Sequence, residues 1–379
     1  MQNHNFTLPN FKNSIVNVTA TISQFLGNQP QHTTLPALTK KLDPKSRNVI
    51  FLIIDGMGAK ILEKNLPAKS FLRRHQIATV TSVFPSTTAA ATTSLVSGLT
   101  PAEHGWLAWV LDFDGAVVEL FRSRNFYTKT YLNDRDFVRK TLPYPTFWSS
   151  KTLSRRIFTC MPKISYKYPT PNQILYQSSR EMWHKLHQTC NTPEPKFIYI
   201  YFPELDSLMH HHGTQSHKVR HFLQKLDRKI ATFARRHPDT QLVITADHGQ
   251  VDVKGYAYIC HDTELQNCLV HPPAWDFRAT SFSVKPGYEK QFLQAFQKYA
   301  ADFVLYPFQD LINQGLFGDF SQHPQNRQYC GDYLAIGTDT NKIMVLQHPG
   351  NPKKLHRGTH SGMTADEMLV PVIVATGKE

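Results

Sequence analysis

The chain has 379 residues, of which 41% are hydrophobic and 12% aromatic, so it is able to bury a large core. This composition excludes disordered, collagen-like and low-complexity proteins. The 42 Lys and Arg residues outnumber the 29 Asp and Glu residues, and the formal net charge of +13 favours an anionic partner or substrate.

The cysteines and the N-terminal segment indicate a cytoplasmic protein. Five cysteines (Cys160, Cys190, Cys260, Cys268 and Cys330) form no Cys-x-x-Cys pair, which favours reduced thiols packed as small apolar groups. The N-terminal residues lack a basic patch followed by an apolar run, so no secretory signal is expected. No segment approaches the roughly 18 uninterrupted apolar residues that a membrane-spanning helix needs.

The first elements in chain order are a helix and a buried strand. Residues 14–26 place Ile15, Val18, Ile22 and Leu26 near helical spacing and predict a helix. A polar segment with several prolines follows at 29–44. Residues 48–55 form a continuous apolar run that ends in Asp, which is typical of a strand buried on both faces of a parallel sheet.

Two further apolar runs predict strands of the same sheet. They occupy 197–202 and 241–247, and residues 218–237 between them carry an apolar stripe at helical spacing. A strand, a helix and a strand in this order form a βαβ crossover between parallel strands. We therefore predict an α/β fold with a mainly parallel sheet.

Two segments interrupt this pattern within what we predict to be one catalytic domain over 1–379. Residues 106–195 are rich in aromatic side chains and irregular, and we expect an insertion on the substrate side. Residues 278–345 alternate short strand patterns with the helical stretch 288–303, and we expect a small α+β insertion.

Acidic and histidine side chains gather where the predicted strands end. Asp55 ends the first strand, and Asp247 and His248 end the third. Asp206 and His210 follow the second strand at a spacing of four, which puts both on one face of a helix. His360 precedes a final apolar run. Ligands bind beyond the carboxyl ends of the strands in open α/β sheets, so we expect these clusters to meet there.

Each residue taken singly also has an ordinary structural explanation. An Asp after a strand often caps a helix or forms a turn, and a lone His in a Gly-rich turn often lies on the surface. Four such clusters at strand ends are better explained by function. Together they supply the carboxylate and imidazole ligands that two zinc-like ions take.

The segment 83–105 supplies a candidate nucleophile. Phe84-Pro-Ser-Thr ends an extended stretch, and residues 89–97 predict a helix of small residues that stops at Gly98. Thr88 would lie at the helix start, where backbone N–H groups and the helix dipole attract an anion. Capping of the helix by Ser86, Thr87 and Thr88 is an equally good explanation of these residues.

The motifs taken together resemble the alkaline phosphatase superfamily, and within it the nucleotide pyrophosphatase/phosphodiesterase group. The similarity runs from Asp55 to Pro371 in the order of the family. It rests on Phe84-Pro-Ser-Thr-Thr, Gly98-Leu-Thr-Pro-Ala-Glu-His-Gly, Asp206-x-x-x-His210, Ala246-Asp-His-Gly and Gly358-Thr-His-Ser-Gly-Met-Thr-x-x-Glu-Met-x-Val-Pro. The resemblance implies a three-layer sandwich with a mainly parallel central sheet and helices on both faces.

The resemblance also implies roles for single residues. One metal ion would be held by Asp206, His210 and His360, and the other by Asp55, Asp247 and His248. Thr88, counted back from Gly98 without a gap, would be the nucleophile that bridges towards the metals, with Thr87 as its neighbour. The donor set favours two Zn²⁺ ions, with Mn²⁺ as the alternative.

The sequence departs from the family at one phosphate contact. The family carries an Asn shortly after its His-Gly, and the corresponding residue here is Trp109. Trp106 and Trp109 would either stack on a ring of the substrate or belong to the core. Arg122, Arg124, Lys129 and Arg278 are candidates to replace the missing contact or to lie on the surface.

We therefore predict a two-metal hydrolase that cleaves phosphodiester or pyrophosphate bonds of small, nucleotide-like phosphate esters through a phospho-threonine. A phosphomonoesterase or a phosphonate hydrolase of the same superfamily is the alternative. A non-catalytic binder of an anionic polymer is the distant alternative, but no helix-turn-helix, zinc-finger or RNP motif for nucleic acid occurs.

Overall fold

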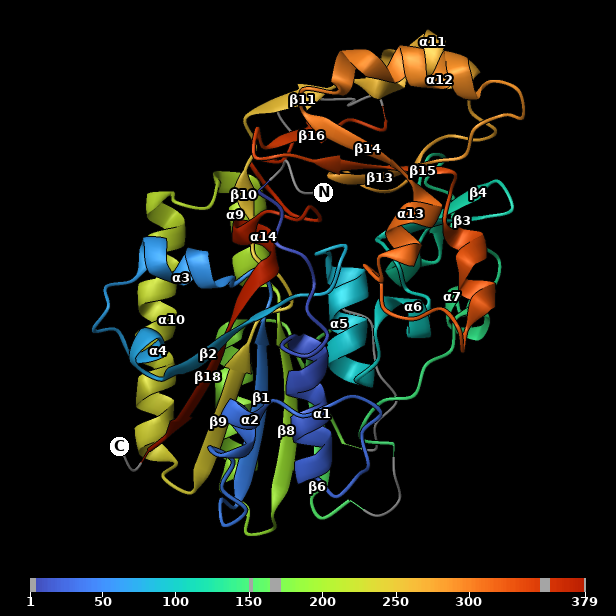
Figure 1. Cartoon of the computed structure of the whole chain (residues 1–379). Helices are drawn as coiled ribbons and strands as arrows, with labels where there is room; N and C mark the ends of the chain where they lie inside the picture. The colour runs from blue at the N-terminus through green and yellow to red at the C-terminus, as the bar shows by residue number, and fades with distance from the viewer. Residues whose placement is uncertain (1–4, 150–152, 164–171, 348–354, 378–379) are drawn as a thin grey trace.

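A large, mainly parallel sheet forms the body of the protein in the computed structural model, which describes residues 5–149, 153–163, 172–347 and 355–377 (Figure 1). In the described part this sheet has seven strands. In order across the sheet they are β2 (Gln76–Thr81), β18 (Leu369–Thr376), β9 (Thr240–Thr245), β1 (Asn48–Ile54), β8 (Lys196–Phe202), β6 (Arg156–Pro162) and β7 (Gln173–Tyr176). Only β18 runs antiparallel to its neighbours there.

The three strands predicted from continuous apolar runs lie together in the middle of this sheet. β1 pairs in parallel with β8 on one side and β9 on the other, and every residue of β1 and β9 is buried. This burial explains why the runs show no alternation of apolar and polar residues. Since the three strands are parallel, their carboxyl ends reach the same edge of the sheet.

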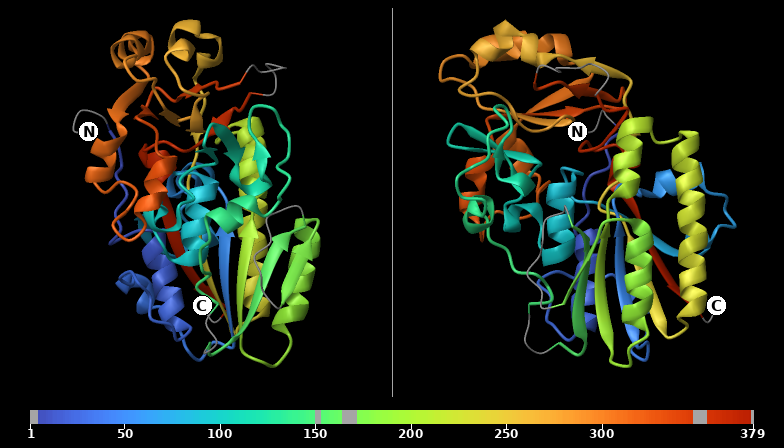
Figure 2. Two further views of the ribbon diagram at one scale, coloured as in Figure 1. Left: turned by 90° about the vertical axis from the view of Figure 1, so that its right-hand side faces the viewer. Right: turned by 180° about the vertical axis from the view of Figure 1, so that it is seen from behind.

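Helices cover both faces of the sheet, as Figures 1 and 2 show from opposite sides. On one face α1 (Ile15–Phe25) packs against α5 (Thr88–Ser97). On the other lie α8 (Ser179–Cys190) and the long α10 (His217–Arg236). α3 (Ala59–Asn65), α4 (Phe71–Arg74) and α9 (Glu204–His212) contact α10, and the short α2 (Pro36–Thr39) contacts β2. The predicted three-layer sandwich is confirmed.

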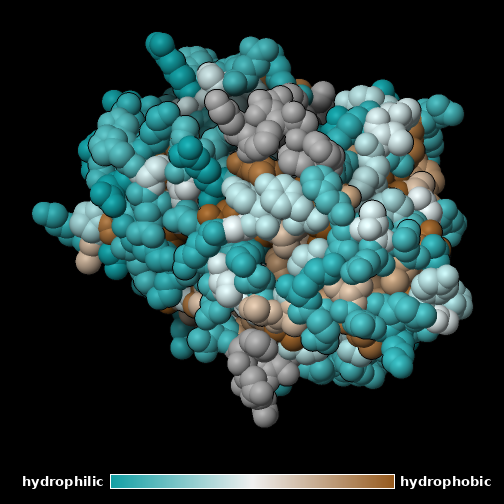
Figure 3. Space-filling model, turned by 90° about the horizontal axis from the view of Figure 1, so that it is seen from above, coloured by the Kyte–Doolittle hydropathy of each residue, from teal (hydrophilic) through white to brown (hydrophobic). Residues whose placement is uncertain are grey.

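A smaller part of the protein, built around a second sheet, lies above the carboxyl edge of the central sheet (Figure 1). A four-stranded antiparallel sheet there has the order β12 (Ala274–Asp276), β13 (Ala279–Phe282), β15 (Tyr333–Gly337) and β14 (Phe303–Pro307). It carries α11 (Thr263–Asn267), α12 (Glu289–Phe296) and α13 (Phe308–Asn313). Strands and a helix thus occur where they were expected between 278 and 345, but the helix predicted over 288–303 ends at Phe296, and Phe303 begins β14. Seen from above, this part exposes mostly hydrophilic side chains, with apolar ones between them (Figure 3).

Short elements link the two parts. A three-stranded sheet consists of β3 (Val110–Phe113), β4 (Ala116–Glu119) and β5 (Arg124–Asn125), and β3 contacts β12. Two small pairs join β10 (Val251–Asp252) to β17 (Gly358–Thr359) and β11 (Gly255–Ala257) to β16 (Lys342–Met344). α6 (Pro101–His104), α7 (Phe137–Thr141) and α14 (Ala365–Met368) are single turns or little longer.

The expectation that 106–195 is irregular is wrong for its second half. β6 and β7 extend the central sheet beyond β8, and α8 packs beside them. Sequence inspection missed β6 because its apolar run is short and begins at the charged pair Arg155 and Arg156.

No helix within the described ranges combines the length and the apolar character needed to cross a bilayer.

The buried His104 makes the stability of this fold depend on pH. Its Nδ1 accepts a hydrogen bond of 3.0 Å from the backbone N–H of Trp106, so its proton lies on Nε2, 3.1 Å from Ser94 Oγ. Burial lowers the pKa of His104 to about 3, against the opposing charge of Glu103. As the pH falls below about 6.5, His104 of the unfolded chain binds a proton, whereas His104 of the folded protein stays neutral. Falling pH therefore favours the unfolded state.

We therefore expect His104 to cost the folded state about 1.4 kcal/mol of unfolding free energy per pH unit between about pH 6 and pH 4. Urea unfolding of wild type and His104→Gln at three pH values measures this contribution. The wild-type free energy should fall more steeply with decreasing pH than that of the variant. Equal slopes for the two proteins would contradict the assignment.

Candidate active site

The carboxyl edge of the central sheet gathers the six acidic and histidine side chains singled out in the sequence. Asp55 directly follows β1, and Asp247 and His248 follow β9. Asp206 and His210 lie on α9, the helix after β8, as the spacing of four predicts. His360 follows β17. Of these residues Asp55, Asp206, Asp247 and His248 are at most 9% exposed.

The three histidines all direct Nε2 at the carboxylates and Nδ1 at a backbone carbonyl group. Nδ1 of His210, His248 and His360 lies 2.7, 3.0 and 2.9 Å from the carbonyl oxygens of Gly358, Gly249 and Ser86, respectively. A carbonyl only accepts hydrogen bonds, so each Nδ1 carries the proton. In the neutral imidazole each Nε2 therefore carries the lone pair, the arrangement found in metal-ligating histidines.

These Nε2 atoms face carboxylate oxygens at short distances. His248 Nε2 lies 3.5 Å from Asp55 Oδ1 and 3.3 Å from Asp247 Oδ2, and His210 Nε2 lies 3.3 Å from Asp206 Oδ2. A neutral Nε2 and a carboxylate oxygen are both acceptors, so either a proton or a metal ion must lie between them. Burial opposes protonation of His210, but attraction to Asp206 outweighs it and raises the pKa of His210. Two ligand atoms at about 2.0–2.1 Å from a tetrahedral ion are separated by about 3.3 Å, which matches these distances.

Two oxygens of the group are buried without a hydrogen-bond partner. They are Asp55 Oδ1 and Asp247 Oδ2, both of which face His248. Buried polar atoms are nearly always paired, so two unpaired carboxylate oxygens at this place suit a bound cation. The site therefore fits a bound metal ion on the chemistry of its donors and on its unpaired oxygens.

The carboxylates also shift one another's protonation. Burial, and then the negative charges of Asp247 and Asp206, raise the pKa of Asp55 well above its ordinary value. Burial raises the pKa of Asp247 as well. Burial opposes ionisation of Asp206, but attraction to its histidine neighbours, His210 first, outweighs it and lowers the pKa of Asp206. A cation bound here would relieve the repulsion that raises the first two values.

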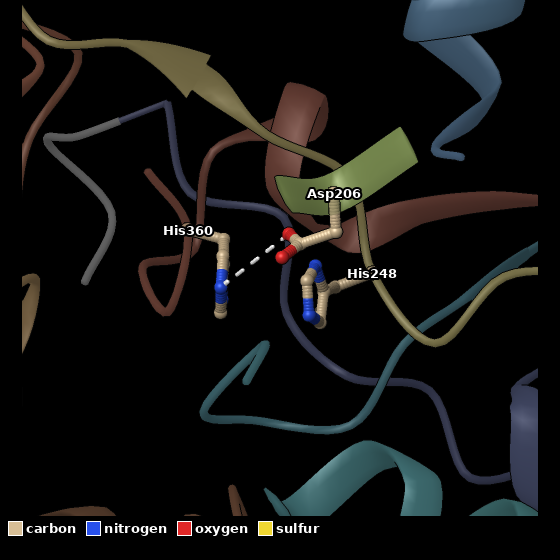
Figure 4. Close-up of side chains that lie close together, drawn as sticks. All are labelled: Asp206, His248 and His360. Atoms are coloured by element: carbon tan, nitrogen blue, oxygen red, sulfur yellow. Dashed lines mark ion pairs between the residues drawn. The ribbon is translucent and has the colours of Figure 1, made fainter. Parts of the chain in front are cut away.

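Two groups of three residues place their ligand atoms within 4.8 Å of one another. One is Asp55, Asp247 and His248, and the other is Asp206, His248 and His360. Figure 4 shows the second group, with the carboxylate of Asp206 between the two rings and His360 Nε2 3.9 Å from Asp206 Oδ1. His248 is therefore placed between the two groups, and His210 contacts the second group through Asp206.

Thr88 begins α5 beside these groups. Its Oγ lies 3.1 Å from His248 Nε2, and only 8% of the residue is exposed. Thr87 occupies the N-cap position, but its side chain makes no capping bond and donates a 3.1 Å hydrogen bond to Asp276 Oδ1. Of the two adjacent threonines, Thr88 is thus the one directed at the histidine and carboxylate cluster. The ten-residue α5 adds the positive end of its dipole at this point.

Close backbone contacts hold the strand-end loops together. A Cβ on Gly249 would overlap the carbonyl oxygen of Asp366, and a Cβ on Gly58 would overlap the Cα of Gly249. The loops after β1 and β9 and the segment after His360 can approach this closely only because both residues are glycine. The glycines of Asp-Gly-Met-Gly and Ala-Asp-His-Gly therefore have a packing role.

Sequence inspection missed three polar residues at the site. The hydroxyl of Tyr201 donates to Asp55 Oδ2, and the side-chain amide of Gln250 donates to Asp206 Oδ1. Asp276, on β12, accepts from Thr87 Oγ and from the backbone N–H of Trp109, and burial raises its pKa to about 6. Only Gln250 had a signal in the sequence, since it directly follows Ala-Asp-His-Gly.

Trp109 lines the same cavity, of about 1340 Å³, that contains Asp55, Thr88, Asp206 and His360. Trp106 does not, because it is fully buried, packs edge-on against Tyr144 and donates its indole N–H to the carbonyl oxygen of Leu142. Substrate stacking by Trp106 is thus wrong, and it is a core residue.

Arg278 is neither a phosphate contact nor a surface residue, which corrects both expectations. It is 0% exposed and binds Glu367 through Nε at 2.7 Å and Nη2 at 3.0 Å. The two oxygens of Glu367 also accept from the backbone N–H groups of Gly362 and Thr364. Arg278 therefore anchors the loop that carries His360. By contrast Arg122, Arg124 and Lys129 do line the cavity.

Comparisons with known proteins identify the family and the fold. The model of the type I phosphodiesterase/nucleotide pyrophosphatase family matches residues 49–302. None of the curated proteins matches the sequence. Among solved structures, murine ectonucleotide pyrophosphatase/phosphodiesterase 5, in an inactive threonine-to-alanine form in complex with AMP, is similar with a TM-score of 0.61 and 15% identity over 87% of this chain and 88% of that one. The human counterpart gives 0.60 and 16% over 86% and 87%.

We expect the metal-free protein to be destabilised by its own carboxylates. Zn²⁺ at about 100 times its Kd should raise the unfolding free energy by about 2.7 kcal/mol. Asp55→Asn removes one ligand and one repelling charge, so without metal it should melt higher than wild type at pH 8 and gain less from Zn²⁺. Thermal melts after chelation and after Zn²⁺ addition measure this.

Glu63→Gln is the matched control, because Glu63 is an exposed carboxylate outside both groups. It should respond to Zn²⁺ as wild type does. A wild type whose melting temperature ignores both chelator and Zn²⁺ would contradict a metal site at this edge.

Proposed function

The chain belongs to the type I phosphodiesterase/nucleotide pyrophosphatase family of hydrolases, and we propose that it cleaves phosphodiester or pyrophosphate bonds of nucleotide-like substrates with two divalent ions, Zn²⁺ or alternatively Mn²⁺, and a threonine nucleophile. The observation that carries this proposal is the position of Thr88 Oγ, 3.1 Å from the histidine that is placed between both groups of metal ligands. A nucleophile at that place can reach a phosphorus atom held by both groups.

The proposed ligands follow the two triplets implied by the sequence. Asp55, Asp247 and His248 would hold one ion, and Asp206, His210 and His360 the other. Support comes from the Nε2 lone pairs directed at carboxylates and from the two unpaired carboxylate oxygens. Divalent ions bound there would supply charge neutralisation for the phosphate and a lowered pKa for a coordinated hydroxyl.

Thr88 is proposed to attack the phosphate directly. Its Oγ forms a bond to phosphorus as the bond from phosphorus to the leaving alcohol or phosphate breaks, and its hydroxyl proton passes to solvent. Water then attacks phosphorus from the side opposite Thr88, the bond between phosphorus and Oγ breaks, and Oγ regains a proton. The N-terminus of α5 is oriented to stabilise the anion during both steps. The inactive murine relative carries a threonine-to-alanine substitution, which supports a threonine in this role.

Trp109 is proposed to contact the substrate beside the reacting phosphate. It is part of the cavity wall, and its backbone N–H is fixed by Asp276 at 3.1 Å. Its ring packs edge-on against Phe121, with ring centroids 5.6 Å apart, which leaves a rigid aromatic surface in the cavity. A base or another planar group of the substrate can pack on such a surface.

The first activity test compares a diester with its matching monoester. Bis(p-nitrophenyl) phosphate should be hydrolysed with a kcat/KM at least about tenfold above that of p-nitrophenyl phosphate, because the cavity has room for a group on both sides of the phosphate. A chelator should abolish the activity, and Zn²⁺ should restore it. A preference for the monoester would support the phosphatase alternative instead.

The nucleophile is tested by two neighbouring alanine variants. Thr88→Ala should lower kcat by at least about a thousandfold while the bound metal, measured by mass spectrometry, stays at the wild-type content. Thr87→Ala removes a hydroxyl bound to Asp276 rather than one near the ligands, and we expect it to lose about tenfold or less. If Thr88→Ala turns over like wild type, or if Thr87→Ala is the inactive one, the assignment is wrong.

A further inference from the structure

One wall of the active-site cavity carries a cluster of positive side chains that the proposed reaction does not use. Arg122, Arg124 and Lys129 all line the cavity, which at about 1340 Å³ exceeds the roughly 300–1,000 Å³ of a typical small-molecule site. They come from β5 and the segments on either side of it. The cavity therefore extends well beyond the room that one phosphate ester needs.

The three cations share a single carboxylate. Glu119, at the end of β4, has a side chain only 3% exposed and binds Arg124 Nη2 at 2.8 Å, Arg122 Nη1 at 3.2 Å and Lys129 Nζ at 3.2 Å. One negative charge thus faces three positive ones. One cation would suffice to neutralise the carboxylate of Glu119, so the cluster carries two positive charges in excess at the cavity wall.

An aromatic ring lies beside each of the three cations. Arg122 lies 6.0 Å from the centre of the Trp109 ring, Arg124 5.8 Å from that of Tyr131, and Lys129 4.3 Å from that of Phe126. The side chain of Arg124 is 19% exposed, and its Nε is buried without a hydrogen-bond partner. The side chains of Arg122 and Lys129 are 54% and 44% exposed, so Arg124 is the cation that is largely fixed before an anion binds and that loses least conformational entropy on binding it.

A continuous set of contacts leads from the nucleophile to the cluster, with Asp276 and Trp109 in between. Thr87, next to Thr88, binds Asp276, Asp276 binds the backbone N–H of Trp109, and the ring of Trp109 lies against Arg122. An anion on Arg122, Arg124 and Lys129 would therefore lie beyond Trp109, away from the reacting phosphate. The two anion sites are distinct places in one cavity.

We propose that Arg122, Arg124 and Lys129 bind a second phosphate group of the substrate, so that this enzyme prefers phosphodiesters bearing an additional terminal phosphate. The proposal rests on the function proposed above. Two guanidinium groups and an ammonium beside one another match the oxygens of a phosphate dianion, which makes charge-assisted hydrogen bonds to them. The excess charge of the cluster equals the charge of that dianion.

The test uses two pairs of esters that differ by one phosphate each. The first pair is thymidine 5′-(p-nitrophenyl phosphate) without and with a 3′-phosphate. The second is phenyl thymidine 5′-phosphate without and with a phosphate on the phenyl ring. The pairs place the added phosphate on opposite sides of the scissile bond. In wild type the added phosphate of at least one pair should raise kcat/KM about tenfold or more.

Variants then assign the preference to the cluster. Arg124→Gln should reduce the ratio of kcat/KM between the two members of the preferred pair at least about tenfold, mainly through KM, and Arg124→Lys should keep part of it. Arg122→Gln, whose side chain is 54% exposed, serves if the first variant melts below wild type. Lys140→Gln removes an exposed cation that pairs with Asp134 outside the cavity, and it should keep the wild-type ratio.

The outcomes separate this inference from the function on which it rests. If wild type cleaves the plain esters but prefers neither phosphate-bearing one, the second site is wrong and the proposed function stands. The same holds if both Arg variants keep the full preference. If wild type cleaves none of the four esters with Zn²⁺ present, the proposed function fails and this inference fails with it.

Discussion

The burial of three carboxylates at one edge of the central sheet is the constraint on which the rest of the site depends. Asp55 and Asp247 come from loops and Asp206 from helix α9, far apart in the chain, and each is at most 9% exposed. Negative charges this close and this dry are stable only when cations balance them. The imidazole nitrogens directed at these carboxylates are suited to bind a cation together with them. The N-terminus of α5 beside them is suited to an anion that such a cation would attract.

Contacts with neighbouring residues hold the segments at this edge of the sheet in place. The carboxylate of Glu367 binds Arg278 and two backbone N–H groups of the loop after His360, while Gly249 allows the backbone of Asp366 to approach. A buried ion pair adds little net stability compared with an apolar pair of the same shape. Its contribution here is positional, since it fixes the loop that carries His360, the proposed histidine ligand nearest the C-terminus.

The basic character of the protein is not concentrated at the reaction centre. The exposed face of α10 alone carries seven Lys and Arg side chains: Lys218, Arg220, Lys225, Arg228, Lys229, Arg235 and Arg236. The proposed metal ligands are instead rich in carboxylates, and the cations of the cavity wall lie beyond Trp109. A net charge of +13 therefore describes the outside of the protein better than its active site.

The sequence by itself determined the elements and the candidate ligand residues whose signals are local. Continuous apolar runs identified β1, β8 and β9, and the residues that follow them were placed at one edge because parallel strands end together. The sequence did not reveal Asp276, the burial of Trp106 and Arg278, or the extension of the sheet by β6 and β7, since these depend on partners distant in the chain. Arg122, Arg124 and Lys129 are close to Glu119 in the sequence, but only the tertiary structure decided that this cluster lines the same cavity as Thr88, because residues 119–129 and Thr88 meet only when the chain folds.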